Sequence, residues 1–226
     1  MRAMTHHSRQ FIRHIGWLCL AIALGSPEPA AAQSAATWSF AGPFGAPARV
    51  VRLAADPRND STLYLLAPGG GVLKTQDGGA LWAPITDSLP SLQFCSMAID
   101  PHSPDVLYLG TGDLQSPRPF QSVARSSDGG RTWELQARFT NQPVCALAVD
   151  PTNSTRVLAG SGEGLFLSQD AGTTWSKVLG AAVTSIAFDS QGIVYAGTLA
   201  DDAAGVREHA VARSSDNGRK IGRAHV

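Results

Sequence analysis

Residues 126–133 read Ser-Ser-Asp-Gly-Gly-Arg-Thr-Trp, and closely similar segments occur at three other places in the chain. They are Thr75-Gln-Asp-Gly-Gly-Ala-Leu-Trp82, Ser168-Gln-Asp-Ala-Gly-Thr-Thr-Trp175 and Ser214-Ser-Asp-Asn-Gly218. The aspartates of successive segments are separated by 51, 42 and 46 residues. A period of this length is typical of proteins built from repeated supersecondary units. The chain is therefore expected to fold as a series of similar units.

The spacing within each segment predicts a turn that is closed by its own side chains. A short Asp side chain accepts hydrogen bonds from backbone N–H groups a few residues further on. The Gly two positions after the Asp can adopt a positive φ without a steric penalty, and the Trp begins the next strand. We therefore assign a structural role, and not a catalytic one, to Asp77, Gly79, Trp82, Asp128, Gly130, Trp133, Asp170, Gly172, Trp175, Asp216 and Gly218.

The segments between these turns predict four strands in each repeat. Apolar runs that end in a turn occupy residues 50–57, 94–101, 144–151 and 183–189, and second strands occupy 63–67, 107–111, 157–161 and 194–198. Third strands lead into the turns at 72–74, 123–125, 165–167 and 211–213, and a fourth strand begins at the Trp of the first three turns. Four antiparallel strands in about 40 to 50 residues make one blade of a β-propeller. The predicted fold is an all-β propeller of four-stranded antiparallel blades.

The propeller is expected to be incomplete, with three blades and part of a fourth. We predict blades at about residues 50–90, 91–140, 141–181 and 182–220, the last one cut at its third hairpin. A partial propeller at residues 33–220 would expose blade faces that pack on neighbours in a closed ring. Residues 221–226 correspond to the codons ATC GGA AGA GCA CAC GTC, which resemble a sequencing adapter, so we interpret these six residues as an artefact.

The first 32 residues have the order of a signal peptide. Basic residues are followed by the apolar run Ile15–Leu24 and then by small residues up to Ala32. The apolar run is about half of the roughly 20 residues that a membrane span requires. We therefore expect cleavage after Ala32, no membrane span in the mature chain, and a secreted, extracellular or periplasmic protein.

Charge and composition exclude two classes of function. Basic and acidic residues number 18 each, and removal of Arg2, Arg9, Arg13, Arg223 and Glu28 with the two end segments leaves a net charge of −3. A mildly acidic chain without a basic stripe is not expected to bind nucleic acid. Only two histidines remain outside the end segments, so no histidine-based metal site is predicted. Nothing in the sequence calls for a cofactor.

Two cysteines remain after signal removal, Cys95 and Cys145, at the same register of adjacent repeats. Secretion favours a disulfide, but the matching positions in the other repeats are Val51 and Thr184, as expected for a small buried slot. Neighbouring inner strands of a propeller diverge, and Cα atoms more than about 7 Å apart cannot be bridged. We expect buried free thiols, with a disulfide as the alternative.

Ligand binding is expected at the loops between the second and third strands of each blade. These loops lie on the face opposite the Asp-containing turns, and two of them, 113–121 and 199–209, are long. Variable loops on a rigid scaffold are where binding usually evolves. Candidate catalytic carboxylates on this face are Asp113, Glu163, Asp201 and Asp202, and candidate binding residues are Asp113, Arg118, Phe120, Arg207 and Glu208.

The pattern Ser-x-Asp-x-Gly-x-Thr-Trp, seen at residues 126–133 and in related form at the other turns, resembles the Asp-box of bacterial neuraminidase repeats. Such repeats occur in sialidases, xyloglucan-cleaving hydrolases, sortilin-type receptors and photosystem assembly factors. The resemblance implies a propeller, but it assigns no reaction because these families do unrelated things. The Arg triad, Tyr–Glu pair and Asp of sialidases find no match here, so the sortilin-like class is the nearer likeness.

Three functions follow as hypotheses. The first is a secreted, non-catalytic propeller that binds a protein or glycan partner. The second is a sialidase-like or xyloglucanase-like glycoside hydrolase, which needs two carboxylates across a sugar bond and would take part of its catalytic residues from further blades. The third is a structural module of a larger cell-surface protein.

Overall fold

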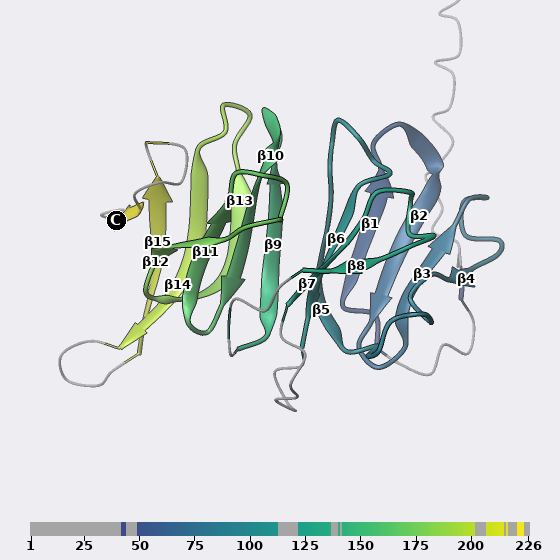
Figure 1. Ribbon diagram of the computed structural model, residues 1–226, viewed down its shortest axis with the longest axis horizontal. Coiled ribbons are helices and arrows are strands. Elements are labelled where there is room, and N and C mark those ends of the chain that lie inside the picture. The colour runs from purple at the N-terminus through teal and green to yellow at the C-terminus, as the bar shows by residue number, and fades with distance from the viewer. Residues whose placement is uncertain are drawn as a thin grey trace, which may run out of the picture. The chain divides into compact units, whose positions relative to one another are not determined.

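The computed structural model describes residues 42–43, 49–112, 122–136, 140, 142–201, 207–214, 216 and 221–223. These residues form four antiparallel sheets of four strands each, in which every strand pairs with the next one along the chain. The described residues contain no helix. Figure 1 shows the sheets following one another in chain order, as consecutive blades do. The predicted all-β propeller is confirmed.

The strand bounds follow the predicted repeat closely. The first sheet contains β1 (Arg52–Asp56), β2 (Asn59–Ala67), β3 (Gly71–Thr75) and β4 (Ala83–Pro84). The second contains β5 (Phe94–Ile99), β6 (Leu107–Thr111), β7 (Val123–Ser126) and β8 (Glu134–Leu135). The third contains β9 (Val144–Asp150), β10 (Asn153–Ser161), β11 (Gly164–Ser168) and β12 (Ser176–Leu179), and the fourth contains β13 (Ala182–Phe188), β14 (Val194–Asp201), β15 (Arg207–Ser214) and β16 (Ile221–Arg223).

The fourth sheet differs from the expectation in two places. The sequence predicts a long loop at residues 199–209, but β14 and β15 continue their ladder to the pair Asp201 and Arg207. Period-two alternation is weak in this stretch, so the sequence did not reveal the added pairs. The fourth position of this sheet is taken by the three-residue strand β16, which lies in the segment that we interpret as adapter-derived and pairs with β15 through its backbone.

The hydrophobic core lies between consecutive sheets. One cluster joins Tyr64, Leu66 and Val72 of the first sheet to Phe94, Leu107 and Leu109 of the second. A second cluster joins the second sheet to the third, and a third cluster joins the third sheet to the fourth. Each inner sheet thus buries both faces, which explains why the central strands β6 and β11 are buried at every position.

The Asp-containing turns are closed as the spacing predicts. In the second turn the Ser126 hydroxyl donates to Asp128 Oδ1 at 2.8 Å and accepts from the Gly130 N–H at 2.9 Å. Asp128 also accepts the N–H and the hydroxyl of Thr132, at 2.9 and 2.6 Å. The third turn repeats all four bonds. The residue after each of the first three aspartates and the Gly that follows it have positive φ.

The first turn lacks one of these bonds because Leu81 replaces the Thr. The Thr75 hydroxyl and the Leu81 N–H still donate to Asp77, at 2.7 and 2.9 Å. In the fourth turn the Ser214 hydroxyl donates to Asp216 at 2.9 Å, and Gly218 lies outside the described residues. The bond from the Thr132 hydroxyl, followed by that from its N–H, lowers the pKa of Asp128 to about 2.

Loss of the Thr hydroxyl should raise the pKa of the Asp that it contacts. We expect Thr132→Val to raise the pKa of Asp128, and Leu81→Thr to lower that of Asp77 by supplying the missing donor. Because the pKa of Asp128 is depressed by folding, its stabilising effect is full above the unfolded value of about 3.9 and is lost as the pH falls towards 2. NMR titration of the carboxyl carbons measures both shifts, and an unmoved Asp128 pKa in Thr132→Val would contradict the assignment.

A buried ion pair links the third sheet to the fourth. Arg156, at 8% exposure, contacts the fully buried Asp150 through its Nη2. The same nitrogen donates to the Gly192 carbonyl at 2.7 Å, and the guanidinium lies 5.5 Å from the centre of the Phe188 ring. The residue that corresponds to Arg156 in the second repeat is Val106. The ion pair is therefore a feature of this junction and is not found in every repeat.

Removal of the Arg156 cation should leave Asp150 buried without a counter-ion. We expect Arg156→Met to lower the free energy of unfolding by about 3–5 kcal/mol. Part of this loss should return when Asp150→Asn removes the uncompensated charge. The matched surface control is Arg58→Met, because Arg58 lies 3.7 Å from the exposed Asp105 and such pairs contribute about 0–1 kcal/mol. Urea unfolding measures the free energy of unfolding of each variant. Equal decreases in Arg156→Met and Arg58→Met would refute the prediction.

The two cysteines form a disulfide, so the expectation of free thiols is wrong. The Cα atoms of Cys95 and Cys145 are 4.8 Å apart. The inner strands β5 and β9 converge at this end, where the Ser96 hydroxyl donates to the Val144 carbonyl at 2.6 Å. A Cβ on Gly110 would lie 1.9 Å from that carbonyl oxygen, so only Gly at position 110 permits this approach.

The disulfide closes a loop between cysteines 50 residues apart, and it should stabilise the second and third sheets together. For such a loop the chain-entropy relation gives about 4 kcal/mol. We expect the double variant Cys95→Val, Cys145→Thr, which uses the residues found at this register in the first and fourth sheets, to melt at a lower temperature. A reductant should lower the Tm of the unmodified protein and leave that of the variant unchanged. Two titratable thiols in the unreduced, unmodified protein would disprove the disulfide.

Candidate functional site

The inner strands of all four sheets meet at a pocket, here called the inner-strand pocket. Its volume is about 450 Å³, and it is lined by Arg49, Val51, Arg52, Pro68, Gln93, Phe94, Cys95, Gly112, Cys145 and Thr184. A smaller cavity of about 130 Å³ continues along the same strands and shares Arg52, Cys145 and Thr184. The disulfide therefore forms part of the pocket wall.

The inner-strand pocket lies at the end of the sheets where the second and third strands of each blade are joined. Pro68 belongs to the β2–β3 connection, and Gly112 follows β6. Phe94 at the start of β5 pairs with Thr111 at the end of β6. The Asp-containing turns lie at the other end, beside the first loops of their own blades, because Gly78, Gly129 and Ala171 donate their N–H groups to the carbonyls of Ser61, Asp105 and Thr155. The two faces are thus separate, as the sequence predicted.

The chemistry of the inner-strand pocket is that of polar recognition. Arg49 and Arg52 are exposed cations, and Arg52 donates to the neighbouring Val51 carbonyl at 3.1 Å. Gln93 and Thr184 add hydrogen-bonding groups, and the buried Phe94 adds an aromatic wall. No carboxylate lines this pocket among the described residues. These side chains suit the binding of a polar ligand. The described lining residues include no pair of carboxylates that could act as general acid and base.

The predicted site residues are only partly described. Glu163 lies half-buried in the β10–β11 loop, where its N–H donates to the Ser161 hydroxyl at 3.1 Å, and it does not line the pocket. The backbone pairs Asp201 with Arg207 and Ala200 with Glu208. Asp113, Arg118, Phe120 and Asp202 lie outside the described residues. The structure therefore does not bring a catalytic pair together from these candidates.

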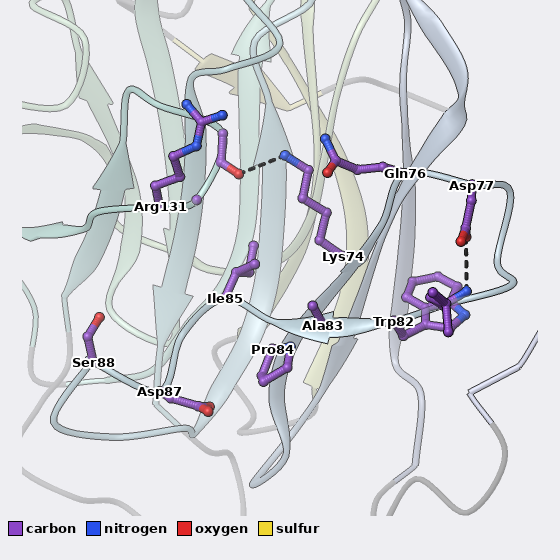
Figure 2. Close-up of a pocket in the computed structure, with 13 residues that line it drawn as sticks. Lys74, Gln76, Asp77, Trp82, Ala83, Pro84, Ile85, Asp87, Ser88 and Arg131 are labelled. Atoms are coloured by element: carbon purple, nitrogen blue, oxygen red, sulfur yellow. Dashed lines mark hydrogen bonds between the residues drawn. The ribbon is translucent and has the colours of Figure 1, made fainter.

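Sequence reasoning missed a second hollow, on the face of the Asp-containing turns. This outer groove of about 700 Å³ lies between β4 and the second turn, and Figure 2 shows Lys74, Trp82 and Arg131 among its lining residues. Lys74 donates to the Gly129 carbonyl at 3.0 Å, and Trp82 Nε1 donates to the Gly79 carbonyl at 3.1 Å. Burial lowers the pKa of Lys74. The groove is built from the repeated scaffold, so no pattern in the sequence distinguishes it.

The described residues offer no site for a metal and no membrane span. They contain no group of three His, Cys, Asp or Glu side chains placed to hold a metal ion. Within the same ranges, no helix has the length and hydropathy that crossing a bilayer requires.

The chain is similar to xyloglucanases. A xyloglucanase from Hypocrea jecorina is 30% identical over 181 residues, which is 70% of this chain and 21% of that protein. A xyloglucanase from Paenibacillus sp. is 32% identical over 134 residues, or 51% of this chain and 13% of that protein. No family model matches the chain. The chain thus spans about a fifth or less of the length of these relatives.

Solved structures support the fold. The GH74 xyloglucanase from Xanthomonas campestris has a TM-score of 0.64 at 23% identity, over 78% of this chain and 30% of that one. YCF48 from Cyanidioschyzon merolae has a TM-score of 0.58 at 14% identity, over 80% of this chain and 57% of that one. Similarity at this level of identity supports the propeller and nothing finer.

The xyloglucanase relatives change the order of the functional hypotheses. From the sequence, a non-catalytic, sortilin-like binding module stood first, and neither xyloglucanase is a protein of that kind. These relatives favour the second hypothesis, a glycoside hydrolase, over the first.

Proposed function

We propose that this chain is part of a secreted glycoside hydrolase whose substrate is a glucan of the xyloglucan class. The observation that carries the proposal is the similarity of 70% of the chain to a xyloglucanase at 30% identity. The relatives are several times longer than the stretch that they share with this chain. Further blades or domains of the same polypeptide would then complete the propeller and the catalytic centre.

In this proposal the inner-strand pocket and the loops around it bind the glycan. A neutral polysaccharide needs hydrogen-bonding side chains and an apolar wall, and the pocket offers Arg52, Gln93 and Thr184 for the first requirement. The described lining lacks carboxylates, so the general acid and its partner must come from other residues. Asp113 is the first candidate, because it directly follows the pocket residue Gly112 in the chain. Asp202, which directly follows the last residue of β14 in the sequence, is the second.

The four Asp-containing turns are proposed to be Asp-boxes that act as scaffold. Each aspartate of the first three turns accepts hydrogen bonds from a hydroxyl and an N–H group of its own turn. Carboxylates with lowered pKa values, such as that of Asp128, are poor proton donors near neutral pH. Catalysis is therefore assigned to the opposite face.

The test is hydrolysis of soluble xyloglucan by the complete polypeptide that contains this chain, followed by release of reducing ends. We expect turnover, and we expect Asp113→Ala or Asp202→Ala to lower kcat by roughly 10²- to 10⁴-fold with xyloglucan binding retained, since a general acid or base contributes about that much. Asp60→Ala is the matched control, because Asp60 is an exposed carboxylate next to Ser61, which contacts the first Asp-containing turn on the other face.

Two results would count against the hydrolase. Binding of xyloglucan without any turnover, in the unmodified protein and the variants alike, would favour a non-catalytic binding propeller. Turnover that survives in both Asp113→Ala and Asp202→Ala would rule out these two residues as the catalytic carboxylates.

A further inference from the structure

The outer groove lies between two neighbouring blades that both belong to the described structure. Its walls are the β3–β4 hairpin, the link that follows β4 and the second Asp-containing turn. Its volume of about 700 Å³ exceeds that of the inner-strand pocket and falls within the range of ligand pockets, about 300–1,000 Å³. Figure 2 shows Ala83 on β4, with Trp82 to one side of it and Ile85 to the other. The hollow is therefore large enough to hold a short stretch of a polymer.

The openness of the groove at the first turn does not depend on the position of the first sheet at the end of the array. Leu81 is 76% exposed, and Trp82 is half-buried. The residues at the same positions of the second and third turns have the same burial, with exposed Thr132 and Thr174 and half-buried Trp133 and Trp175. Those turns belong to sheets that have a neighbour on each side. A blade packed against the first sheet is therefore expected to leave Leu81 and Trp82 as open as these residues.

Leu81 gives up a hydrogen bond that the next two turns make. The Thr132 hydroxyl donates to Asp128 at 2.6 Å, and the Thr174 hydroxyl donates to Asp170 at the same distance. A leucine has no such donor, and its apolar side chain is left in contact with solvent. The stability of the turn therefore does not explain this residue. A ligand that covers the side chain does, because burial of apolar surface is favourable.

The space in the groove depends on a short side chain on β4. Ala83 lies opposite Lys74, whereas at the equivalent pair of the second sheet Glu134 lies opposite Arg125. Because Ala83 ends at Cβ, it leaves room beside the Lys74 side chain that a glutamate would occupy. In the sequence Leu81 and Ala83 are ordinary surface residues, and only the pairing of the strands places both of them around one hollow.

The lining combines an apolar strip with polar groups at its edges. The apolar part consists of Leu81, Ala83, Pro84 and Ile85, and the exposed polar side chains are Gln76, Asp87, Ser88 and Arg131. A sugar ring presents apolar C–H faces and a rim of hydroxyl groups. The ring can therefore pack on the strip while its hydroxyl groups bond to the edges, as in other sites with an apolar lining and a few polar groups.

The charges of the lining balance. Lys74 and Arg131 are cations, and Asp77 and Asp87 are carboxylates. Lys74 also donates to the Gly129 carbonyl at 3.0 Å, and Asp77 accepts hydrogen bonds from its own turn. A groove of this kind exerts no net attraction on a polymer of either charge. Its lining thus suits a neutral ligand.

We infer that the outer groove is a second glycan-binding site, which holds a short stretch of a neutral glucan on the face opposite the proposed catalytic centre. Leu81 and Pro84 pack against the sugar ring, and Arg131, Asp87 and Ser88 bond to its hydroxyl groups. A polymer held there has a raised effective concentration at the other face of the same molecule. The choice of a glucan rests on the proposed function, whereas the site itself rests on the lining of the groove.

Site-resolved NMR of the complete polypeptide, labelled with ¹⁵N at tryptophan, tests this site with a soluble xyloglucan oligosaccharide as the probe. We expect the Trp82 indole N–H signal, assigned with Trp82→Phe, to shift as the probe concentration rises. The signal of Trp175, at the same position of the third turn, should stay in place. Ala83→Glu should weaken the binding that Trp82 reports by roughly tenfold or more, because the added side chain fills the groove and displaces apolar contacts.

Leu81→Thr separates a role in ligand binding from a role in the turn. It supplies the missing donor to Asp77, so it should raise the Tm of the protein. It also removes apolar surface from the groove, so it should weaken binding of the probe by roughly threefold or more. A residue that only shaped the turn would not weaken binding while the turn became more stable.

Ser176→Glu is the matched control for Ala83→Glu, because Ser176 is exposed at the equivalent position of β12 in the third sheet. It should bind the probe like the unmodified protein. Far-ultraviolet circular dichroism verifies that each variant is folded. The inference is overturned if the Trp82 signal does not move, if folded Ala83→Glu or Leu81→Thr binds as tightly as the unmodified protein, or if acidic polygalacturonate moves the signal and the neutral probe does not.

Release of reducing ends from the same probe judges the proposed function separately. Turnover without movement of the Trp82 signal would contradict the second site and leave the hydrolase standing. Movement of that signal without turnover would contradict the hydrolase and leave the second site standing.

Discussion

The hydrogen bonds that close each Asp-containing turn are the constraint on which the rest of the structure depends. The Asp and Ser side chains hold the backbone in a tight turn with positive φ at the residue after the Asp. In that conformation the N–H of this residue faces its own blade and the carbonyl faces the preceding one. The local turn therefore sets how one blade meets the next, and a repeated octapeptide can direct a repeated tertiary contact.

The first two junctions share this link, whereas the third is built differently. The first depends on Lys74 and Tyr64, and the second adds a disulfide between Cys95 and Cys145. The third combines apolar packing with the Asp150–Arg156 ion pair. Contacts of this kind stabilise particular neighbours, so they also fix the order of the sheets. Repeat proteins of nearly identical units need such differences to avoid shifted pairings.

The different roles of the two faces also follow from the hydrogen bonds that close the turns. The Asp carboxylates of the first three turns accept hydrogen bonds from their own turns and have lowered pKa values, so they are poor proton donors near neutral pH. The opposite face has connections whose lengths vary between blades, and the inner strands of all four sheets reach a common pocket there. A glycan-binding or hydrolytic centre can vary on that face while the turns keep the blades together.

The sequence by itself determined the repeat, the strand order and the structural role of the Asp residues, because these depend on spacing and on bonds within a few residues. It also predicted that β4, β8 and β12 follow the Trp of each turn, which the strand bounds confirm to within one residue. Interactions between residues that are close in the sequence can be inferred from a single amino-acid sequence. The two turn faces followed from the alternation of strand direction alone.

Only the tertiary structure decided the contacts between residues far apart in the chain. The disulfide depends on how closely β5 approaches β9, and that distance is set by the missing side chain of Gly110. The partner of Arg156 and the lining of the inner-strand pocket likewise depend on the angle between neighbouring sheets. Spacing within one repeat carries no information about that angle, because it arises from the packing of whole sheets against each other.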